Sequence, residues 1–228
     1  MGDYCTFLVD TFISQSNAIR TAPDILSKLI NDRIINAESC MTICSDSIFP
    51  FHPEFRQPHQ DDVASSPFNQ SLYSGMTISV RGYGWDVDSQ GNYYLAASEK
   101  STNGLFMNYD GGFNIQCPHC HNKSSFGWAV EEDNARSEDE IAARQDAISS
   151  ALGIWHDQGI SHLKCHDCQT QSPIQSWQTG SFAAGYLAVT LWGQQFSLRD
   201  LENDFNWLLA LLNPNQDRDR IAVVGCMI

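Results

Sequence analysis

Two Cys-x-x-Cys pairs are the residues of this chain whose type and spacing are best suited to chemistry. The first spans Cys117–Cys120 and the second spans Cys165–Cys168. A Cys-x-x-Cys turn directs two sulfur atoms at one point, so two such turns can supply the four thiolates of a tetrahedral metal site. Four protein ligands leave no open coordination position, and such a site is structural rather than catalytic.

The two pairs resemble the two knuckles of a zinc ribbon, and the resemblance is limited to them. Small or polar residues inside each pair, such as Pro118 and Asp167, permit a tight turn. The gap between the pairs is longer than the roughly 15–20 residues usual for such sites, because a helix is predicted between them. Ligands need only meet in space, so the sequence still predicts one structural Zn²⁺, bound by Cys117, Cys120, Cys165 and Cys168.

The thiols and the nearby histidines admit other interpretations. A redox dithiol would need a single pair placed after a strand and opening a helix, and neither pair has that context. One of His119, His121 and His166 could replace a cysteine as ligand, although positions beside the site or exposed in the turns are preferred. The remaining cysteines are interpreted as thiols without a metal: Cys5, Cys40, Cys44 and Cys226.

The elements that must position these residues follow a strand–helix–strand order at both ends of the chain. At the start, a buried strand over Tyr4–Asp10 precedes a helix that is predicted to begin at Thr21, and a second strand begins near Arg33. At the end, a strand over 185–193, a helix capped by Ser197 and a strand over 220–228 follow one another. We therefore predict an α+β fold with an antiparallel or mixed sheet, of which a ferredoxin-like arrangement is one form.

The middle of the chain is predicted to be an insertion into that fold. Residues 76–98 and 104–115 each have the pattern of a β-hairpin. A helix follows, with Ser137 and Glu140 as a capping box and one apolar face. That face comprises Ile141, Ile148, Ala151, Leu152 and Trp155. The expected organisation is residues 1–75 as a strand–helix–strand unit with an irregular arm, 76–180 as hairpins and metal knuckles, and 181–228 as the unit completing the main domain.

The charge of the chain indicates the kind of partner it can bind. It has 13 basic and 27 acidic side chains, a net charge of −14. Such a surface repels nucleic-acid phosphates and attracts basic proteins. A cluster of acids near the start of the central helix, taken alone, is typical of a solvated helix start, and together with the charge of the whole chain it indicates a docking patch for a basic partner. Its members are Glu131, Glu132, Asp133, Glu138, Asp139 and Glu140.

The function expected from these patterns is binding without catalysis. The sequence contains no phosphate-binding loop, nucleophile elbow or His-Glu-x-x-His motif. We expect an acidic, zinc-stabilised module that masks a basic protein, for example a bacterial immunity or inhibitor protein that neutralises a toxin. The alternatives are an enzyme such as a hydrolase, using His156, His162 or an unrecognised acid cluster, and a nucleic-acid-binding zinc ribbon. The small number of basic residues near the cysteines argues against the nucleic-acid-binding alternative.

The location of the protein can also be predicted from the chain. No secretory signal and no apolar run approaching the roughly 20 residues of a membrane span is present in the sequence. Eight cysteines without a disulfide-type pattern suit a reducing compartment. We therefore expect a cytoplasmic protein without membrane contact, and the sequence leaves its oligomeric state open.

Overall fold

The structure is a computed structural model and describes most of the chain. The longest segment outside the described residues is 56–76. The described residues are 4–38, 41–43, 46–53, 55, 77–82, 85–87, 93–95, 104–108, 112–127, 137–193, 196, 198–212 and 220–227. They contain both helices and antiparallel sheets, so the predicted α+β class is confirmed. Among them, every helix is too short or too polar to cross a membrane.

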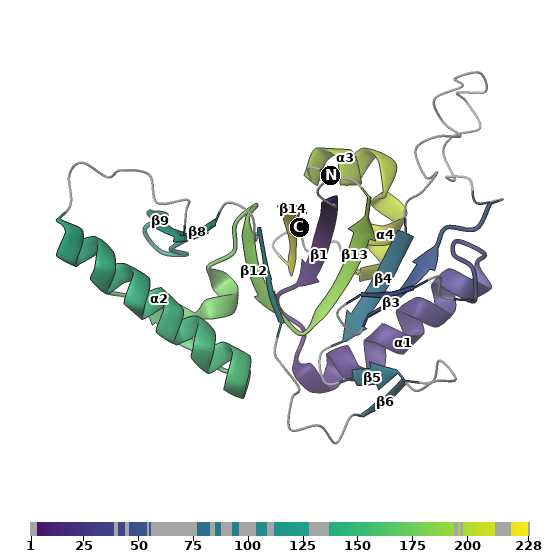
Figure 1. Ribbon diagram of the computed structural model, residues 1–228, viewed down its shortest axis with the longest axis horizontal. Coiled ribbons are helices and arrows are strands. Elements are labelled where there is room, and N and C mark those ends of the chain that lie inside the picture. Colours follow the sequence, from purple (N-terminus) through teal and green to yellow (C-terminus); the bar gives the residue numbers. More distant parts are fainter. Residues whose placement is uncertain are drawn as a thin grey trace.

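A six-stranded antiparallel sheet joins strands from both ends of the chain (Figure 1). Its strand order is β14–β1–β13–β4–β3–β2. The strands span Tyr4–Asp10 (β1), Met41–Ile43 (β2), Asp46–Pro50 (β3), Thr77–Gly82 (β4), Leu187–Trp192 (β13) and Ile221–Met227 (β14). The expectation that the two ends share one sheet is therefore confirmed. β4, which lies within the predicted central segment 76–180, is also a strand of this sheet.

Strand β1 lies inside the sheet because its side chains are apolar on both faces. Its neighbours are β13, where Phe7 is opposite Thr190, and β14, where Phe7 is opposite Val224. All of its residues after Tyr4 are buried. A strand that is covered on both faces carries a nearly continuous apolar run instead of an alternating pattern. The sequence of Tyr4–Asp10 has this property.

Helix α1 (Gln15–Asn31) begins earlier than the sequence predicted. The predicted capping box at Thr21 is wrong, because the Ser14 hydroxyl accepts a hydrogen bond from the Asn17 N–H and forms the N-cap, which leaves Pro23 inside the helix. Its apolar face packs on β4 and β13 through Ala18, Ala22, Ile25, Leu26 and Leu29. The strand predicted near Arg33 is only an isolated bridge between Ile35 and Phe51.

The single helix predicted near the C-terminus consists of two short ones, α3 (Leu198–Asp204) and α4 (Asn206–Leu212). They are separated at Phe205, whose ring is fully buried and contacts Phe196 and Trp207. The Phe205 N–H still donates to the Leu201 carbonyl at 2.8 Å, and the Phe205 carbonyl accepts from the N–H groups of Leu208 and Leu209. The predicted cap, Ser197, lies outside the described residues.

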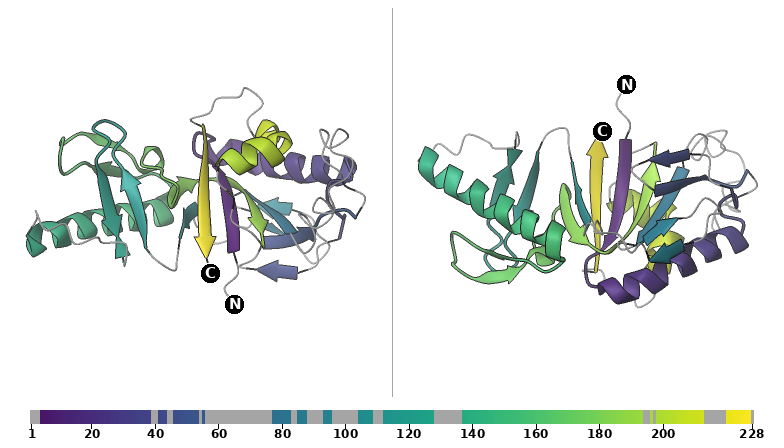
Figure 2. Two further views of the ribbon diagram at one scale, coloured as in Figure 1. Left: turned by 90° about the horizontal axis from the view of Figure 1, so that it is seen from above. Right: turned by 60° about the horizontal axis from the view of Figure 1, so that its bottom comes forward.

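A second group of elements lies beside the large sheet (Figure 2). It contains the two-stranded pair β7 (Gly104–Met107) and β12 (Phe182–Gly185), helix α2 (Glu138–Gln158) and the 3₁₀ turn η3 (Ile174–Ser176). The other strands form hairpins: β5 (Trp85–Val87) with β6 (Tyr93–Leu95), β8 (Phe113–Gln116) with β9 (Lys123–Phe126), and β10 (His162–Lys164) with β11 (Gln171–Pro173).

Two predicted hairpins are therefore wrong in part. Residues 76–98 divide between β4, which joins the large sheet, and the hairpin of β5 and β6. Residues 104–115 contain β7 and β8, which do not pair with each other, because β7 pairs with β12 and β8 pairs with β9. Alternation of apolar residues identifies a strand, but many partner strands satisfy the same alternation.

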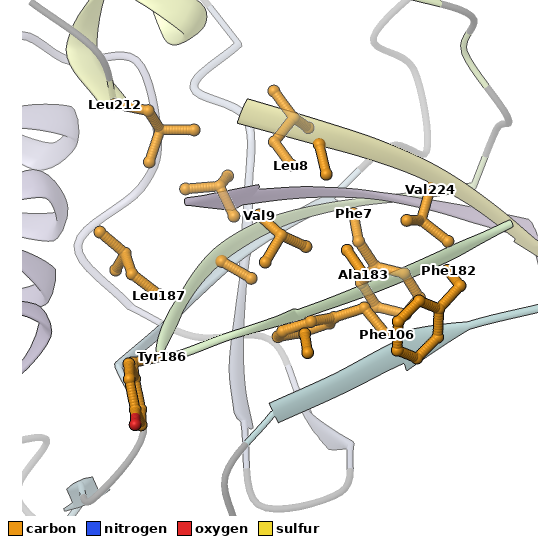
Figure 3. Close-up of a cluster of buried hydrophobic side chains, with 14 of the residues drawn as sticks. Phe7, Leu8, Val9, Phe106, Phe182, Ala183, Tyr186, Leu187, Leu212 and Val224 are labelled. Atoms are coloured by element: carbon orange, nitrogen blue, oxygen red, sulfur yellow. The ribbon is translucent and has the colours of Figure 1, made fainter. Parts of the chain in front are cut away.

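The two groups are joined where β12 continues into β13. Only Tyr186 separates these strands, so one stretch of chain serves both sheets. Phe7 of β1 meets Phe106 of β7 with ring centroids 5.3 Å apart, and Figure 3 shows these rings together with Phe182. A Cβ added at Gly185 would lie 2.6 Å from a Val9 methyl carbon and 2.9 Å from the Asp10 carbonyl oxygen. Glycine is therefore required at this junction.

The end of β1 is fixed by a buried carboxylate. The side chain of Asp10 is fully buried, and its Oδ1 accepts hydrogen bonds from the N–H groups of Phe12 and Ile13. Its Oδ2 accepts two hydrogen bonds from the guanidinium of Arg220, at 2.9 and 2.7 Å. A charge that is both paired and hydrogen-bonded can be buried at a tolerable cost. Asp10 thus ties the first strand to the start of the last.

Replacing Gly185 by alanine tests the close approach at the junction. We expect Gly185→Ala to lower the free energy of unfolding by about 1–3 kcal/mol, because a methyl group must displace Val9 or the backbone of Asp10. Gly180→Ala is the matched control, since nothing lies within 4 Å of its added Cβ and neither glycine has a positive φ. Thermal or denaturant unfolding measures both. Equal stability of the two variants would contradict the packing described for β12.

Candidate metal centre

The first cysteine pair occupies the turn between β8 and β9. The Cys117 N–H donates to the Asn122 carbonyl at 3.0 Å, and the His121 N–H donates to the Cys117 carbonyl at 3.0 Å. The turn closes with His121 in the left-handed region at φ 60°. The Cys117 sulfur also accepts the His119 N–H at 3.5 Å. The hairpin therefore holds both thiols at its tip.

The second pair occupies the turn between β10 and β11 with the same backbone pattern. The Cys165 N–H donates to the Thr170 carbonyl at 2.9 Å, and the Gln169 N–H donates to the Cys165 carbonyl at 3.0 Å. Gln169 has a φ of 61°, so it matches His121 of the first turn. Two hairpins that are far apart in the sequence thus present cysteines through equivalent turns.

The four sulfur atoms lie at one point between the hairpins. Each Sγ is within 4.8 Å of the other three, a spacing that can hold a metal ion. The Cys117–Cys168 and Cys120–Cys165 sulfurs are 3.7 and 3.6 Å apart. Sulfurs bound about 2.3 Å from a tetrahedral ion would be roughly 3.8 Å apart, whereas a disulfide requires about 2.05 Å. The arrangement suits metal coordination and not disulfides.

The thiols differ in their readiness to lose a proton. Hydrogen bonds from the Thr170 side chain and backbone lower the pKa of Cys168 to about 6. Burial raises the pKa of Cys165 to about 12. A thiolate in an apolar surrounding is stabilised when a cation is bound to it, because the cation replaces the lost interaction with water. The buried cysteine therefore depends on a bound cation for its ionised form.

The predicted histidines lie around the cluster and are not among the groups that converge on it. His119 Nε2 is 2.8 Å from the Ser172 hydroxyl of β11, a contact that links the first turn to the second hairpin. His166 Nδ1 is 3.0 Å from Arg144 Nη2. His121 is exposed in its turn. Among the described residues, only the four cysteines form a group with metal-binding spacing.

Helix α2 carries the chain from the first hairpin to the second. Its predicted start is confirmed, since Ser137 and Glu140 form a reciprocal capping box. Ile148, Ala151, Leu152 and Trp155 are buried as predicted, and Gly159 ends the helix in the left-handed conformation at φ 72°. Trp155 donates to the Gly104 carbonyl at 3.0 Å. The helix is therefore fastened to β7 at one end and to the hairpins along its length.

Sequence reasoning missed Arg144, which joins α2 to the second turn. Its Nη2 donates to Asp167 Oδ1 at 2.6 Å, and Asp167 lies between the two cysteines of that turn. A signal was present in the spacing, because Arg144 follows Ile141 by one turn and precedes Ile148 by another. A single charge on an apolar helix face indicates a buried polar contact.

The remaining predicted residues are not part of this centre. Glu138, Asp139 and Glu140 are exposed in the first turn of α2. Three further acids of the predicted patch and two cysteines lie outside the described residues: Glu131, Glu132, Asp133, Cys40 and Cys44. His156 and His162 are both exposed; His156 contacts the adjacent Asp157, at 3.0 Å.

Cys5 and Cys226 are buried thiols, as predicted. They lie opposite each other in the register of β1 and β14. The hydrogen bond between the two side chains, together with burial, raises the pKa of Cys5 far above its usual value. A thiol that keeps its proton is a poor nucleophile and a poor ligand. This pair therefore contributes to packing in the sheet.

Comparisons of the chain with protein-family models, curated proteins and solved structures found no match. The chemistry of the centre must therefore be argued from its own residues.

Removing one thiol of the cluster tests whether it holds a metal. We expect the parent chain to bind one ion per chain and Cys117→Ser to lose it, because a closed site needs all four sulfurs. The unfolding midpoint should fall with the metal, by the equivalent of about 4 kcal/mol when free metal exceeds its dissociation constant about 1,000-fold. Metal analysis and thermal unfolding measure these effects. Cys5→Ala removes a buried thiol outside the cluster and should keep its metal; equal metal content in both variants would contradict the assignment.

The pH dependence of metal binding follows from the shifted pKa values of Cys165 and Cys168. Protons compete with the metal for each sulfur, so affinity falls as the pH falls. Cys165, with a pKa of about 12, competes over the whole neutral range, while Cys168, with a pKa of about 6, takes up a proton only in acid. We expect affinity to fall steadily from pH 8 to 6 and more steeply below 6, in competition with a chelator of known protonation. A constant affinity over this range would be inconsistent with four thiolate ligands.

Proposed function

We propose that Cys117, Cys120, Cys165 and Cys168 bind a structural Zn²⁺. An all-sulfur donor set with near-tetrahedral spacing favours zinc or iron over the hard ions calcium and magnesium. Structural zinc sites are tetrahedral and are often formed by four cysteines, which matches a site with no open position. When bound, the ion would neutralise thiolate charge and hold the two hairpins together. With the hairpins joined, the protein's own side-chain contacts would keep helix α2 and both cysteine turns in place.

We further propose that the protein is a non-catalytic binding module for a basic protein partner. The observation that carries this proposal is the charge of 27 acidic against 13 basic side chains. Helix α2 has a high share of this negative charge, with five exposed acids: Glu138, Asp139, Glu140, Asp146 and Asp157. Its one arginine, Arg144, is turned inward to Asp167. The outer face of α2 is therefore of one sign, and such a face speeds encounter with a cationic partner.

The class of partner that fits is a protein with a basic cleft, such as a bacterial nuclease toxin masked by its immunity or inhibitor protein. Binding of this kind needs complementary charge and a rigid scaffold, and it needs no catalytic group on the binding side. His156 and His162 are exposed, and the Asp157 carboxylate that lies 3.0 Å from His156 is exposed with it, whereas an acid–base site is usually enclosed in a pocket. The exposed lysines near the cysteines, Lys123 and Lys164, are too few to bind nucleic-acid phosphates.

The proposed scaffold is a ferredoxin-like sheet that carries an insertion. β14, β1, β13 and β4 stand in the order of the split β-α-β arrangement, with α1 after β1 and α3–α4 between β13 and β14. The β2–β3 hairpin would then be an addition at the sheet edge. The metal hairpins and α2 would be inserted between the second and third strands of the domain.

Two triple variants that remove the same number of negative charges test the docking face. We expect the triple variant Glu138→Gln, Asp139→Asn, Glu140→Gln to bind its partner, captured from native lysate, at least tenfold more weakly and with less salt dependence. Glutamine at 140 keeps the capping box. The control, Asp24→Asn, Asp32→Asn, Glu202→Gln, removes the same charge from exposed positions elsewhere. Association measured from 50 to 500 mM salt decides between them. Equal effects of the two triples, or binding indifferent to salt, would refute the proposal.

A further inference from the structure

Two large apolar side chains are exposed to solvent where the large sheet meets helix α2. Phe12, in the turn after β1, is 67% exposed, and Ile160, just after α2, is 70% exposed. Among the described residues, the next large apolar side chains are Tyr4 and Ile154, at 43% and 41%. Apolar surface left in water forgoes the stabilisation that burial would give. We call Phe12 and Ile160 the apolar pair.

The apolar pair is carried by two turns that one element, the 3₁₀ turn η3, holds together. The Gln175 side chain donates to the carbonyl of Thr11, the residue before the first member of the pair, at 3.1 Å. The Ile174 N–H donates to the carbonyl of Ser161, the residue after the second member, at 3.0 Å. Consecutive residues of η3 thus contact both turns, so the pair lies in one region of the surface. Apolar side chains that gather in this way, unlike single scattered ones, mark interaction sites.

Hydrogen bonds order both turns, so the apolar pair is presented on a fixed backbone. Asp10 Oδ1 accepts the N–H groups of Phe12 and Ile13, each at 3.0 Å. The Tyr186 hydroxyl donates to the carbonyl of Gly159, which directly precedes the second member of the pair. A side chain on an ordered backbone loses less conformational freedom on binding, and this favours affinity.

The exposed charge beside the apolar pair is negative. The segments that carry the pair and η3 contain no lysine or arginine: 11–17, 154–162 and 173–177. Their one carboxylate, Asp157, has a side chain that is 74% exposed. Arg220, whose carbonyl accepts the hydroxyl of the first turn, is already paired with the buried Asp10. A partner that covers this region therefore meets apolar surface with a free negative charge next to it.

The acidic face of α2 leads to the apolar pair. Asp139, Asp146 and Asp157 are exposed, and their spacings of 7 and 11 residues are close to two and three whole helical turns. They form one line along α2, about 27 Å long at 1.5 Å per residue, which ends three residues before Ile160. This length is comparable to the width of a standard interface of about 800 Å² per partner. One partner can therefore cover the acids and the pair together.

We propose that Phe12 and Ile160 are the apolar anchor for the cationic protein that binds the acidic face of α2. This inference rests on the proposed function, and it adds that the partner presents an apolar side chain flanked by lysines or arginines. A few desolvated apolar residues supply most of the affinity of an interface, whereas exposed charges mainly raise the association rate. The acids would guide the partner, and the apolar pair would hold it.

Two peptides of equal charge separate the anchor from the charge. Each has three lysines at either end, with Leu-Trp-Leu at the centre of one and Ser-Gly-Ser at the centre of the other. With the full chain and its metal, we expect the Leu-Trp-Leu peptide to bind with a dissociation constant of about 0.01–1 mM, at least fivefold more tightly than the other, by calorimetry or NMR titration. Phe12→Ser and Ile160→Ser should each remove most of this advantage and leave binding of the Ser-Gly-Ser peptide unchanged.

The matched control is Tyr4→Ser, which removes an exposed aromatic ring at the opposite end of β1 and should keep the full advantage. Unfolding midpoints are measured for every variant. A spin-labelled Leu-Trp-Leu peptide gives a second readout on the parent chain, where it should broaden the amide resonances of Phe12 and Ile160 before that of Tyr4. This readout does not depend on the folding of any variant.

The outcomes distinguish failure of the anchor from failure of the proposed function. The triple variant Glu138→Gln, Asp139→Asn, Glu140→Gln should weaken both peptides equally and leave the advantage of Leu-Trp-Leu intact. Equal binding of the two peptides to the parent, or a full advantage in Phe12→Ser and Ile160→Ser, would overturn the anchor while charge-driven binding stands. Binding of both peptides that is indifferent to salt and to the triple variant would overturn the proposed function, and the anchor with it.

Discussion

Four sulfur atoms that meet at one point constrain everything built around them. Cys117 and Cys120 come from one hairpin and Cys165 and Cys168 from another, and all four Sγ atoms lie within 4.8 Å of one another. Neither hairpin has more than four residues per strand, and isolated hairpins of this kind are marginal in water. A shared cation would offset the repulsion of the thiolates and close a long loop, which is where a cross-link stabilises most. Helix α2 lies in the chain segment that such a cross-link closes, and the two cysteine turns at its ends set its position.

The two groups of elements depend on each other through buried contacts near β12. Gly185 allows β12 to approach Val9 and Asp10, and Tyr186 then packs its ring against Trp155 at 5.0 Å while its hydroxyl donates to the Gly159 carbonyl. The end of α2 is therefore joined to the large sheet at the point where the strand changes sheets.

The distribution of charge divides α2 into two faces. Its acids are exposed, and its arginine lies inward beside Asp167. Both features are consequences of one helix held between two hairpins. The outer face needs only exposure and charge, whereas the inner face needs an exact register between α2 and the second turn.

The cysteine pairs, the capped start of α2 and the strands β1 and β14 could be predicted from the sequence alone, because each depends on neighbouring residues or on an uninterrupted apolar run. It also indicated that the two chain ends share a sheet. The pairing of β7 with β12 and of β8 with β9 could not be predicted in this way, since alternation does not specify a partner strand. The same holds for the inward position of Arg144. It arises from the packing of α2 on a turn 23 residues further along the chain, and no local propensity encodes such a contact.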